Sequence, residues 1–326
     1  MFLLVSAAIL LLLSSGCANF NIHALKDDTS PLKEFTVRKG SSDGKILLMP
    51  VRGIISDISD PGILKSNPSM VQEVVSQLKL AENDPEIKCL LLTVNSPGGT
   101  VTGSDMLFNE LMNFKKKKNI KIVVCMMDVA ASGGYMISLP ADCIYAHPTT
   151  ITGSVGVIFY QLKIHGLLDK IGVGMDVTKS GDLKDMGSPF RKSTDEEVKM
   201  FQKLIDQLDS RFLDAVKSTR KIDEGKLKEV SSGRVYLAED ALKMGLIDKI
   251  GYMDDAVQTA ADLSGLGKDP EIIVYRRTRF PNDNLYNTAM EQQDGTGKIL
   301  NLGVVGSLAE MQTGFYYIWA PAAGNE

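Results

Sequence analysis

The chain has 326 residues, of which 44% are hydrophobic, so it is long enough to bury a large core. Its formal net charge of −4 argues against a nucleic-acid partner, because phosphate binding requires a basic surface. Cys89, Cys125 and Cys143 lie in or beside apolar runs, without the spacing of metal ligands. They predict buried small side chains, and no disulfide framework, metal or other cofactor is expected.

The N-terminus begins with an apolar run that ends at Leu13 and is followed by Ser14-Ser15-Gly16-Cys17. The run is shorter than the about 20 residues that a membrane-spanning helix needs, so it favours an export signal. Small residues before a cysteine resemble a bacterial lipoprotein processing site, which would make a lipidated Cys17 the mature N-terminus. An uncleaved signal and an Ala-x-Ala signal remain alternatives. We expect a signal peptide over 1–17, a polar tether over 18–44, and a membrane-anchored body in the cell envelope, outside the cytoplasm.

Strands and helices alternate in the next part of the chain. Apolar runs predict buried strands over 46–51, 90–94 and 120–126, and helical spacing predicts helices over 71–80 and 106–114. This alternation implies parallel βαβ units, whose ligand sites lie beyond the C-terminal ends of the strands. The expected fold class is α/β, with a parallel sheet core and peripheral helices.

The elements predicted after this region are mostly shorter. Thr194, followed by three acidic residues, predicts the start of one long amphipathic helix. The other predicted strands are 144–146, 155–159 and 175–178, and the other predicted helices are 162–171, 223–230 and 253–263.

Residues 265–326 form a C-terminal extension of mixed character. A strand is predicted over 272–275, residues 281–297 are polar, and residues 314–321 gather many aromatic side chains. For this aromatic segment we expect docking on its own domain or on a neighbouring subunit. Contact with a membrane interface and occupation of the chain's own substrate groove are the alternatives.

The small-residue run 130–135 contains the candidate nucleophile, Ser132. A serine on a tight turn at a helix N-terminus lies beside free backbone N–H groups, which can stabilise a reacting oxygen. The alternative interpretation is that these small residues only allow a helix to pack closely on a sheet.

A serine nucleophile needs a base, and the three histidines do not lie in motifs typical of a catalytic imidazole. A buried lysine with a lowered pKa can serve instead. Lys184, in the segment 179–185, is the candidate. Its polar surroundings are equally those of an ordinary surface lysine.

Four motifs occur in order: Asn95-Ser96-Pro97-Gly98-Gly99, Ser132-Gly133-Gly134-Tyr135, Thr152-Gly153-Ser154, and the segment 179–185. Together they resemble the signal peptide peptidases of the SppA type, which are serine proteases with a Ser–Lys dyad. The resemblance covers residues 45–264 and implies a crotonase-like or Clp-protease-like fold of repeated β-β-α units. It implies Ser132 as nucleophile, Lys184 as general base, Ser154 as the residue that orients the lysine, and Gly99 as a backbone oxyanion donor.

The resemblance also implies substrates and assembly. Extended apolar peptides, such as leftover signal peptides, are the expected substrates. A homo-oligomeric ring, an octamer in short members of the family, would bring Ser132 and Lys184 together from neighbouring subunits. Two other classes remain: a crotonase-like enzyme acting on coenzyme A thioesters, and a non-catalytic membrane scaffold of the same fold.

Overall fold

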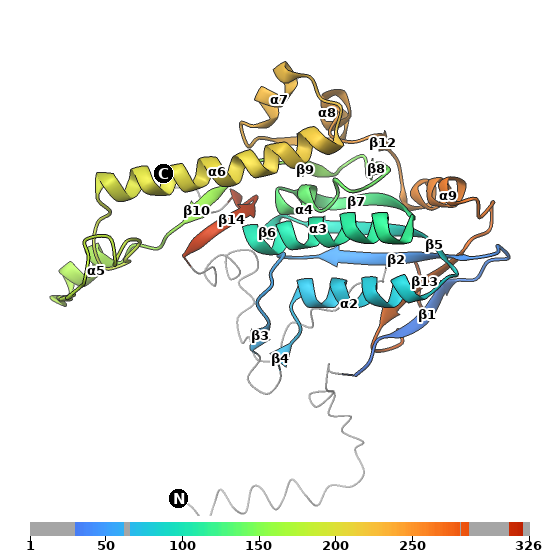
Figure 1. Cartoon of the computed structure of the whole chain (residues 1–326), viewed down its shortest axis with the longest axis horizontal. Coiled ribbons are helices and arrows are strands. Elements are labelled where there is room, and N and C mark those ends of the chain that lie inside the picture. Colours follow the sequence, from blue (N-terminus) through green and yellow to red (C-terminus); the bar gives the residue numbers. More distant parts are fainter. Residues whose placement is uncertain (1–29, 62–65, 281, 287–312, 322–326) are drawn as a thin grey trace, which may run out of the picture.

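The computed structural model describes residues 30–61, 66–280, 282–286 and 313–321 (Figure 1). A nine-stranded sheet forms its centre, in the order β1-β13-β2-β5-β7-β8-β12, with β9 beside β7 and β11 beside β9. Within it, β13, β2, β5, β7, β8 and β12 run parallel. The bounds of these strands are β1 (Lys33–Arg38), β2 (Lys45–Arg52), β5 (Ile87–Ser96), β7 (Lys121–Ala131), β8 (Cys143–Ala146), β9 (Ile151–Gly153), β11 (Val235–Leu237), β12 (Lys249–Ile250) and β13 (Glu271–Arg276).

Helices cover both faces of the sheet, which explains why its central strands are nearly continuous apolar runs. α2 (Met70–Asn83) and α3 (Val101–Lys118) pack on one face, and α9 (Met253–Ser264) packs on the other (Figure 1). The predicted α/β class with a parallel core is therefore confirmed. The strands predicted over 46–51, 90–94 and 120–126 all lie inside observed strands.

The fold begins earlier than the predicted tether allows. β1 lies inside the segment 18–44 and pairs antiparallel with β13, which in turn lies beside β2. Phe35 and Val37 alternate along β1 and pack against the core beneath α9. The C-terminal extension likewise contributes β13 to the main sheet, so the two segments flanking the predicted domain pair with each other. Residues 1–29, including Cys17, lie outside the described residues.

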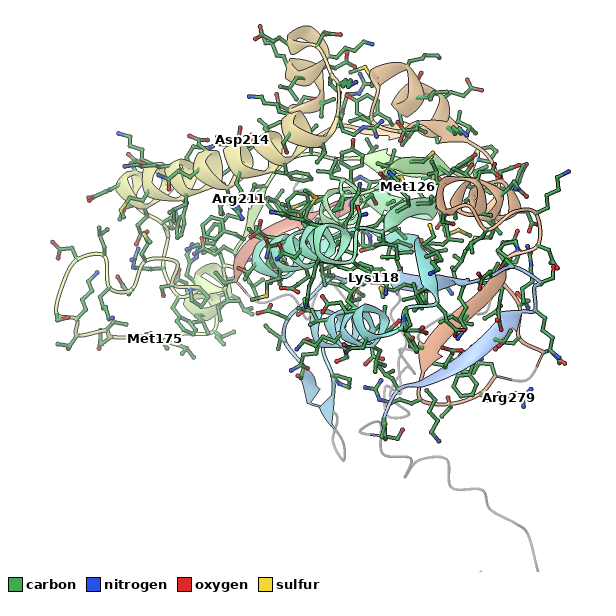
Figure 2. All side chains as sticks on the ribbon, turned by 45° about the vertical axis from the view of Figure 1, so that its right-hand side comes forward. Lys118, Met126, Met175, Arg211, Asp214 and Arg279 are labelled. Atoms are coloured by element: carbon green, nitrogen blue, oxygen red, sulfur yellow. The ribbon has the colours of Figure 1, made fainter. Side chains whose placement is uncertain are left out.

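A long arm leaves the body between residues 158 and 194. It contains β10 (Ile158–Tyr160) and α5 (His165–Lys170), and it returns through α6 (Asp195–Thr219). Thr194 caps α6 in a capping box with Glu197, as predicted. α5 has no buried residue, and Figure 2 shows Met175 at the outer end of the arm.

Two predictions for the arm were wrong. Residues 175–178 form no strand, and the predicted helix 162–171 is only α5. Met175 and Val177 are each about half exposed (53% and 52%), so their apolar character does not reflect burial against a neighbouring strand.

A second, three-stranded sheet joins the arm to the body in the order β10-β14-β6. Its outer strands are β10 and β6 (Gly98–Thr100), and β14 (Gly314–Ile318) runs antiparallel to both. The aromatic segment near the C-terminus therefore docks on its own domain, as expected (Figure 1). The remaining elements are β3 (Asp60–Pro61), β4 (Ser66–Asn67), α4 (Gly133–Met136), α7 (Glu224–Val230) and α8 (Ala238–Met244).

Throughout the described ranges, no helix combines the length and the apolar character that crossing a membrane would require.

Candidate active site

Ser132 follows the last residue of β7 and caps α4 in an unusual backbone conformation. Its φ of 53° and ψ of −117° strain any residue other than glycine, at a cost of about 1–3 kcal/mol. Two backbone hydrogen bonds hold the turn. Ser132 N–H donates to the Gly153 carbonyl (2.7 Å), and the Ser132 carbonyl accepts from Met136 N–H (2.9 Å). The predicted tight turn at a helix N-terminus is thus present.

Close backbone packing explains the two glycines that follow Ser132. A Cβ at Gly133 would lie 2.3 Å from Ser104 Oγ, and a Cβ at Gly134 would lie 2.5 Å from the carbonyl oxygen of Ser96. Neither position has room for a larger side chain. Helix packing therefore accounts for the glycines of the motif but not for the strained serine before them.

The side chain of Ser132 is buried without a partner. The residue is 1% exposed, and its Oγ accepts and donates no hydrogen bond within the described residues. Leaving a buried hydroxyl unpaired costs about 1–3 kcal/mol. Strain and an unpaired hydroxyl at one residue are typical of a functional group rather than a structural one.

The Gly98-Gly99 turn lies directly beside the start of α4. A Cβ at Gly98, whose φ is 105°, would lie 2.7 Å from the backbone nitrogen of Gly133, and a Cβ at Gly99 would lie 1.8 Å from the carbonyl oxygen of Ile55. Only glycine fits either position. The turn thus brings the backbone of β6 next to the first N–H groups of α4, the arrangement that an oxyanion site needs.

β14 lies across this site as an extended peptide. Tyr317 pairs with Gly99 and Ile318 with Gly98, and Trp319 N–H donates to the Pro97 carbonyl (2.8 Å). Cβ atoms built on Gly98 and Gly133 would lie 2.0 and 3.1 Å from the carbonyl oxygen of Tyr317. A peptide carbonyl therefore reaches the junction of the glycine turn and α4.

The side chains of β14 contact α6 on one side and β10 on the other. Tyr317 is fully buried, its ring lies 4.8 Å from that of Phe212, and its hydroxyl donates to the Leu208 carbonyl (2.7 Å). Burial raises the pKa of Tyr317 above its usual range. Phe315 lies 4.7 Å, between ring centroids, from Phe159 on β10. The space that β14 occupies between β6 and β10 therefore accepts large apolar side chains.

Ser154 lies on the adjoining turn after β9. Its φ is also positive (51°), and its N–H donates to the Arg234 carbonyl (2.8 Å). Because Ser132 N–H is bonded to Gly153, the residue before Ser154, the two serine turns are directly linked. Ser154 and Ile318 line a hollow of about 400 Å³ that also contains Asp209, where burial raises the pKa of the carboxyl group. The structure thus groups Ser132, Ser154 and Gly99.

Lys184 does not join this group within one chain. It lies exposed on the arm, its backbone N–H donating to the Gly181 carbonyl (3.1 Å), and no contact links it to Ser132. In Figure 1 the arm projects to the left of the body, whereas α4 lies near its centre. The predicted Ser–Lys pair is not assembled in a single protomer.

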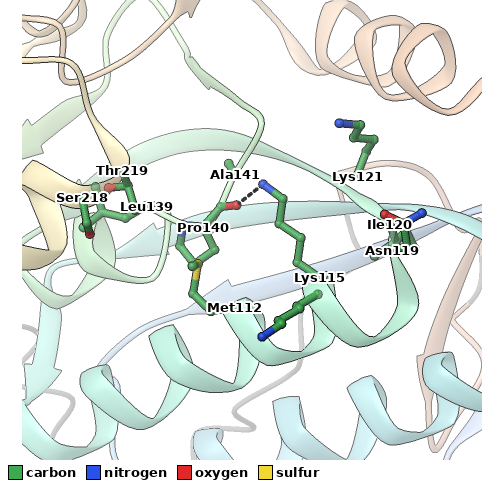
Figure 3. Close-up of a pocket in the computed structure, with 11 residues that line it drawn as sticks. Met112, Lys115, Asn119, Ile120, Lys121, Leu139, Pro140, Ala141, Ser218 and Thr219 are labelled. Atoms are coloured by element: carbon green, nitrogen blue, oxygen red, sulfur yellow. Dashed lines mark hydrogen bonds between the residues drawn. The ribbon is translucent and has the colours of Figure 1, made fainter.

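A second hollow, of about 450 Å³, lies at the other end of α3 (Figure 3). Lys115, Lys116 and Lys121 line it, but Lys115 Nζ already donates to the Pro140 carbonyl (2.8 Å). Lys115 and Lys121 also pair with Asp142, at 3.0 and 3.2 Å. Because two of its three lysines are already paired with Asp142, this hollow is not assigned a ligand.

Several relatives of the chain are described as peptidases or proteases. The sequence profile of peptidase family S49 matches residues 114–267, and that of the Clp proteases matches residues 64–150. A protein of Enterococcus faecium described as a signal peptide peptidase SppA is 37% identical over 267 residues, which cover 81% of this chain and 77% of that protein. Protease 4 of Salmonella typhi is 38% identical over 191 residues, which cover 59% of this chain and 31% of that protein.

Among solved structures, a ClpP1 mutant from Listeria monocytogenes matches with a TM-score of 0.42 and 16% identity, over 64% of this chain and 94% of that chain. The similarity to the Enterococcus faecium protein extends over most of both chains. The chain belongs to peptidase family S49, the family of the SppA-type signal peptide peptidases.

Proposed function

We propose that this serine peptidase cleaves extended apolar peptides with a Ser132–Lys184 dyad. The observation that carries the proposal is the junction at Ser132, where a strained, buried and unpaired hydroxyl lies beside a glycine turn crossed by an extended strand. A peptide bound like β14 would add a strand to β6, so its backbone would be recognised more than its sequence.

In this mechanism the chemistry is acyl transfer. Ser132 Oγ attacks the carbonyl carbon of the peptide while neutral Lys184 takes the hydroxyl proton. The N–H groups of Gly99 and Gly133 stabilise the oxyanion. The protonated lysine then donates to the leaving amine, and water, deprotonated by the same lysine, releases the acyl group. Ser154 orients the lysine amine.

The position of Lys184 supports a site shared between copies. Six large apolar side chains of the arm are each about half exposed or more, which favours covering by a neighbouring molecule. They are Leu162, Leu167, Ile171, Val173, Met175 and Val177. A head-to-tail contact between copies either closes into a ring or grows into a filament. We propose a closed ring, with eight subunits as in short family members.

The envelope location is a separate part of the proposal. Cleavage and lipidation at Cys17 would anchor the peptidase to a membrane and present its site outside the cytoplasm, where remnants of signal peptides are released. The mass of the mature N-terminal peptide tests this part, and an unmodified N-terminus away from Cys17 would refute it without touching the dyad.

Replacement of the two dyad residues tests the function itself. We expect Ser132→Ala and Lys184→Ala each to reduce cleavage of an apolar peptide at least about a thousandfold, because each removes a bond-making or proton-transfer group. A serine-directed phosphonate should label the wild type at Ser132 and leave Ser132→Ala unlabelled. Near-normal cleavage by either folded variant would refute the dyad.

A further inference from the structure

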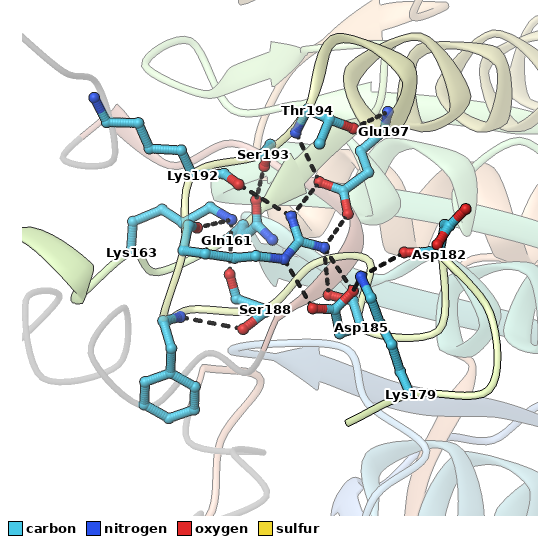
Figure 4. A network of polar contacts seen from close by, with 12 residues as sticks. Gln161, Lys163, Lys179, Asp182, Asp185, Ser188, Lys192, Ser193, Thr194 and Glu197 are labelled. Carbon is cyan, nitrogen blue, oxygen red and sulfur yellow. Dashed lines mark hydrogen bonds and ion pairs between the residues drawn. The ribbon is translucent and has the colours of Figure 1, made fainter. Parts of the chain in front are cut away.

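Arg191 links Asp185, which follows Lys184, to Glu197 in the first turn of α6, and Figure 4 shows these two carboxylates facing each other. Its Nε donates to Asp185 Oδ2 and its Nη2 to Asp185 Oδ1, both at 2.8 Å, and Nη2 also donates to the Asp185 carbonyl (3.1 Å). On the other side, Nη1 donates to Glu197 Oε2 (3.0 Å) and Nη2 to Glu197 Oε1. One planar guanidinium thus clamps the residue next to Lys184.

The clamp is fixed to a rigid element. Glu197 is 1% exposed, and its carboxylate also accepts from Thr194 N–H (2.9 Å) in the capping box of α6. Further along α6, Phe212 and Val216 are fully buried in the core. A displacement of Arg191 would therefore disturb the outer end of a helix whose other end is anchored in the body.

Other contacts complete the support of this segment. Lys179 Nζ donates to Asp185 Oδ1 and to the Asp182 carbonyl, both at 2.7 Å, and Lys163 Nζ donates to the carbonyls of Ser188 (2.8 Å) and Arg191 (3.2 Å). Hydrogen bonds from Arg191 and Lys179 hold the pKa of Asp185 well below its usual range. The polar contacts therefore involve the residues around Lys184, while the Lys184 side chain itself is exposed.

We propose that Arg191 is a positioning residue for the general base, holding Lys184 in place through Asp185 and Glu197. The inference rests on the function proposed above. A general base must be placed to within a fraction of an ångström, and a misplacement of 1 Å can cost about a hundredfold in rate. Lys184 lies one residue from the clamped carboxylate, so the position of its backbone depends on this clamp.

The clamp also balances charge beside the base. Arg191 and Lys179 face Asp185 and Glu197, two cations against two anions, with Lys163 bonded to backbone carbonyls nearby. Removing the guanidinium would leave Asp185 paired with Lys179 alone, and Glu197 with only the charge of Lys163 nearby. The added negative charge would favour the protonated form of a neighbouring lysine, so a higher pH would be needed to generate the neutral base.

The test compares Arg191→Gln and Arg191→Lys with Arg277→Gln. Arg277 Nη1 donates to both oxygens of the buried Glu73 (2.6 and 2.7 Å) on α2, away from the arm, and its removal also leaves a carboxylate unpaired. For Arg191→Gln we expect kcat to fall about a hundredfold, KM to stay within about twofold, and the acid limb of the kcat profile to move to higher pH. Arg191→Lys keeps the positive charge but loses the bidentate guanidinium geometry. In this variant the acid limb of the kcat profile should return to its wild-type pH, while kcat should recover only slightly.

The outcomes separate this inference from the proposed function. Wild-type kcat and pH profile in folded Arg191→Gln would overturn the positioning role, whereas cleavage by Ser132→Ala would overturn the function and the inference with it. An equal loss of rate in Arg277→Gln, with no shift of the limb in either variant, would reduce Arg191 to a structural role. If Arg191→Gln does not fold, Asp185→Asn tests the same contact: a normal rate there overturns the inference.

Discussion

At the scale of single residues, the site is costly to fold. Ser132 combines a positive φ with a buried, unpaired hydroxyl, and a Cβ atom on either of the two following glycines would lie only 2.3 or 2.5 Å from a neighbouring atom. These are costs that a protein retains when function requires them. Relieving them should therefore stabilise the chain while removing activity.

Ser132→Gly and Ser132→Ala separate the two costs. Both remove the unpaired hydroxyl, but only glycine also relieves the backbone strain. We expect Ser132→Gly to exceed Ser132→Ala in free energy of unfolding by about 1 kcal/mol, the strain of roughly 1–3 kcal/mol less the greater chain entropy of glycine. Urea denaturation of the two proteins measures the difference. Equal midpoints would show that the turn carries no strain.

The proximity of Ser132 and Gly99 was predictable from the sequence because each lies in a short motif that follows the end of a parallel strand. Ser132 follows β7, and Gly99 lies just beyond β5. The clamp at Arg191 was not predicted, because Asp185 and Arg191 lie in turns and irregular backbone, where no periodicity indicates which side chains meet. Glu197 was recognised only as part of a helix start.

At the scale of elements, prediction failed where long-range pairing decides the structure. β1 has only Phe35 and Val37 as apolar residues, too weak a signal, and its strand character comes from pairing with β13 more than 200 residues away. β14 is comparable: its aromatic composition predicted docking, but its place between β6 and β10 depends on strands that are distant in sequence.

The position of β14 predicts that it competes with added peptides. A tethered segment has an effective concentration of about a millimolar, so it should outcompete a weakly bound substrate. Deleting residues 314–326 should lower KM for an added apolar peptide several-fold and leave kcat unchanged, as measured by steady-state kinetics. Deleting only 322–326, which keeps β14, is the control. A fall in kcat at unchanged KM would instead make β14 a structural strand.

At the scale of the whole molecule, Ser132 and Lys184 are separated, so one protomer alone would not assemble the proposed dyad. The described body holds Ser132, the glycine turn and Ser154, and the arm holds Lys184, the proposed base, away from them. Apolar side chains exposed along that arm are the expected contact with a neighbouring copy.

Mixing inactive variants tests the shared site. In a ring with random exchange between equal amounts of Ser132→Ala and Lys184→Ala, a site is intact when an intact serine meets an intact lysine from the neighbour, which happens in about a quarter of the sites. We therefore expect about a quarter of wild-type activity, from two proteins that are inactive alone. No recovered activity, with exchange shown by mass spectrometry, would place both residues in one protomer.

The antiparallel pairing of β14 with both β6 and β10 bears on the chain direction of a peptide bound in its place. Gly314 lies opposite Tyr160, and Ile318 lies opposite Gly98, so the chain runs from the arm toward the glycine turn. A peptide in the place of β14 but running the other way would pair parallel to both edges, with slanted and slightly weaker hydrogen bonds. We therefore expect the site to distinguish a sequence from its reversal, even where the two carry the same side chains.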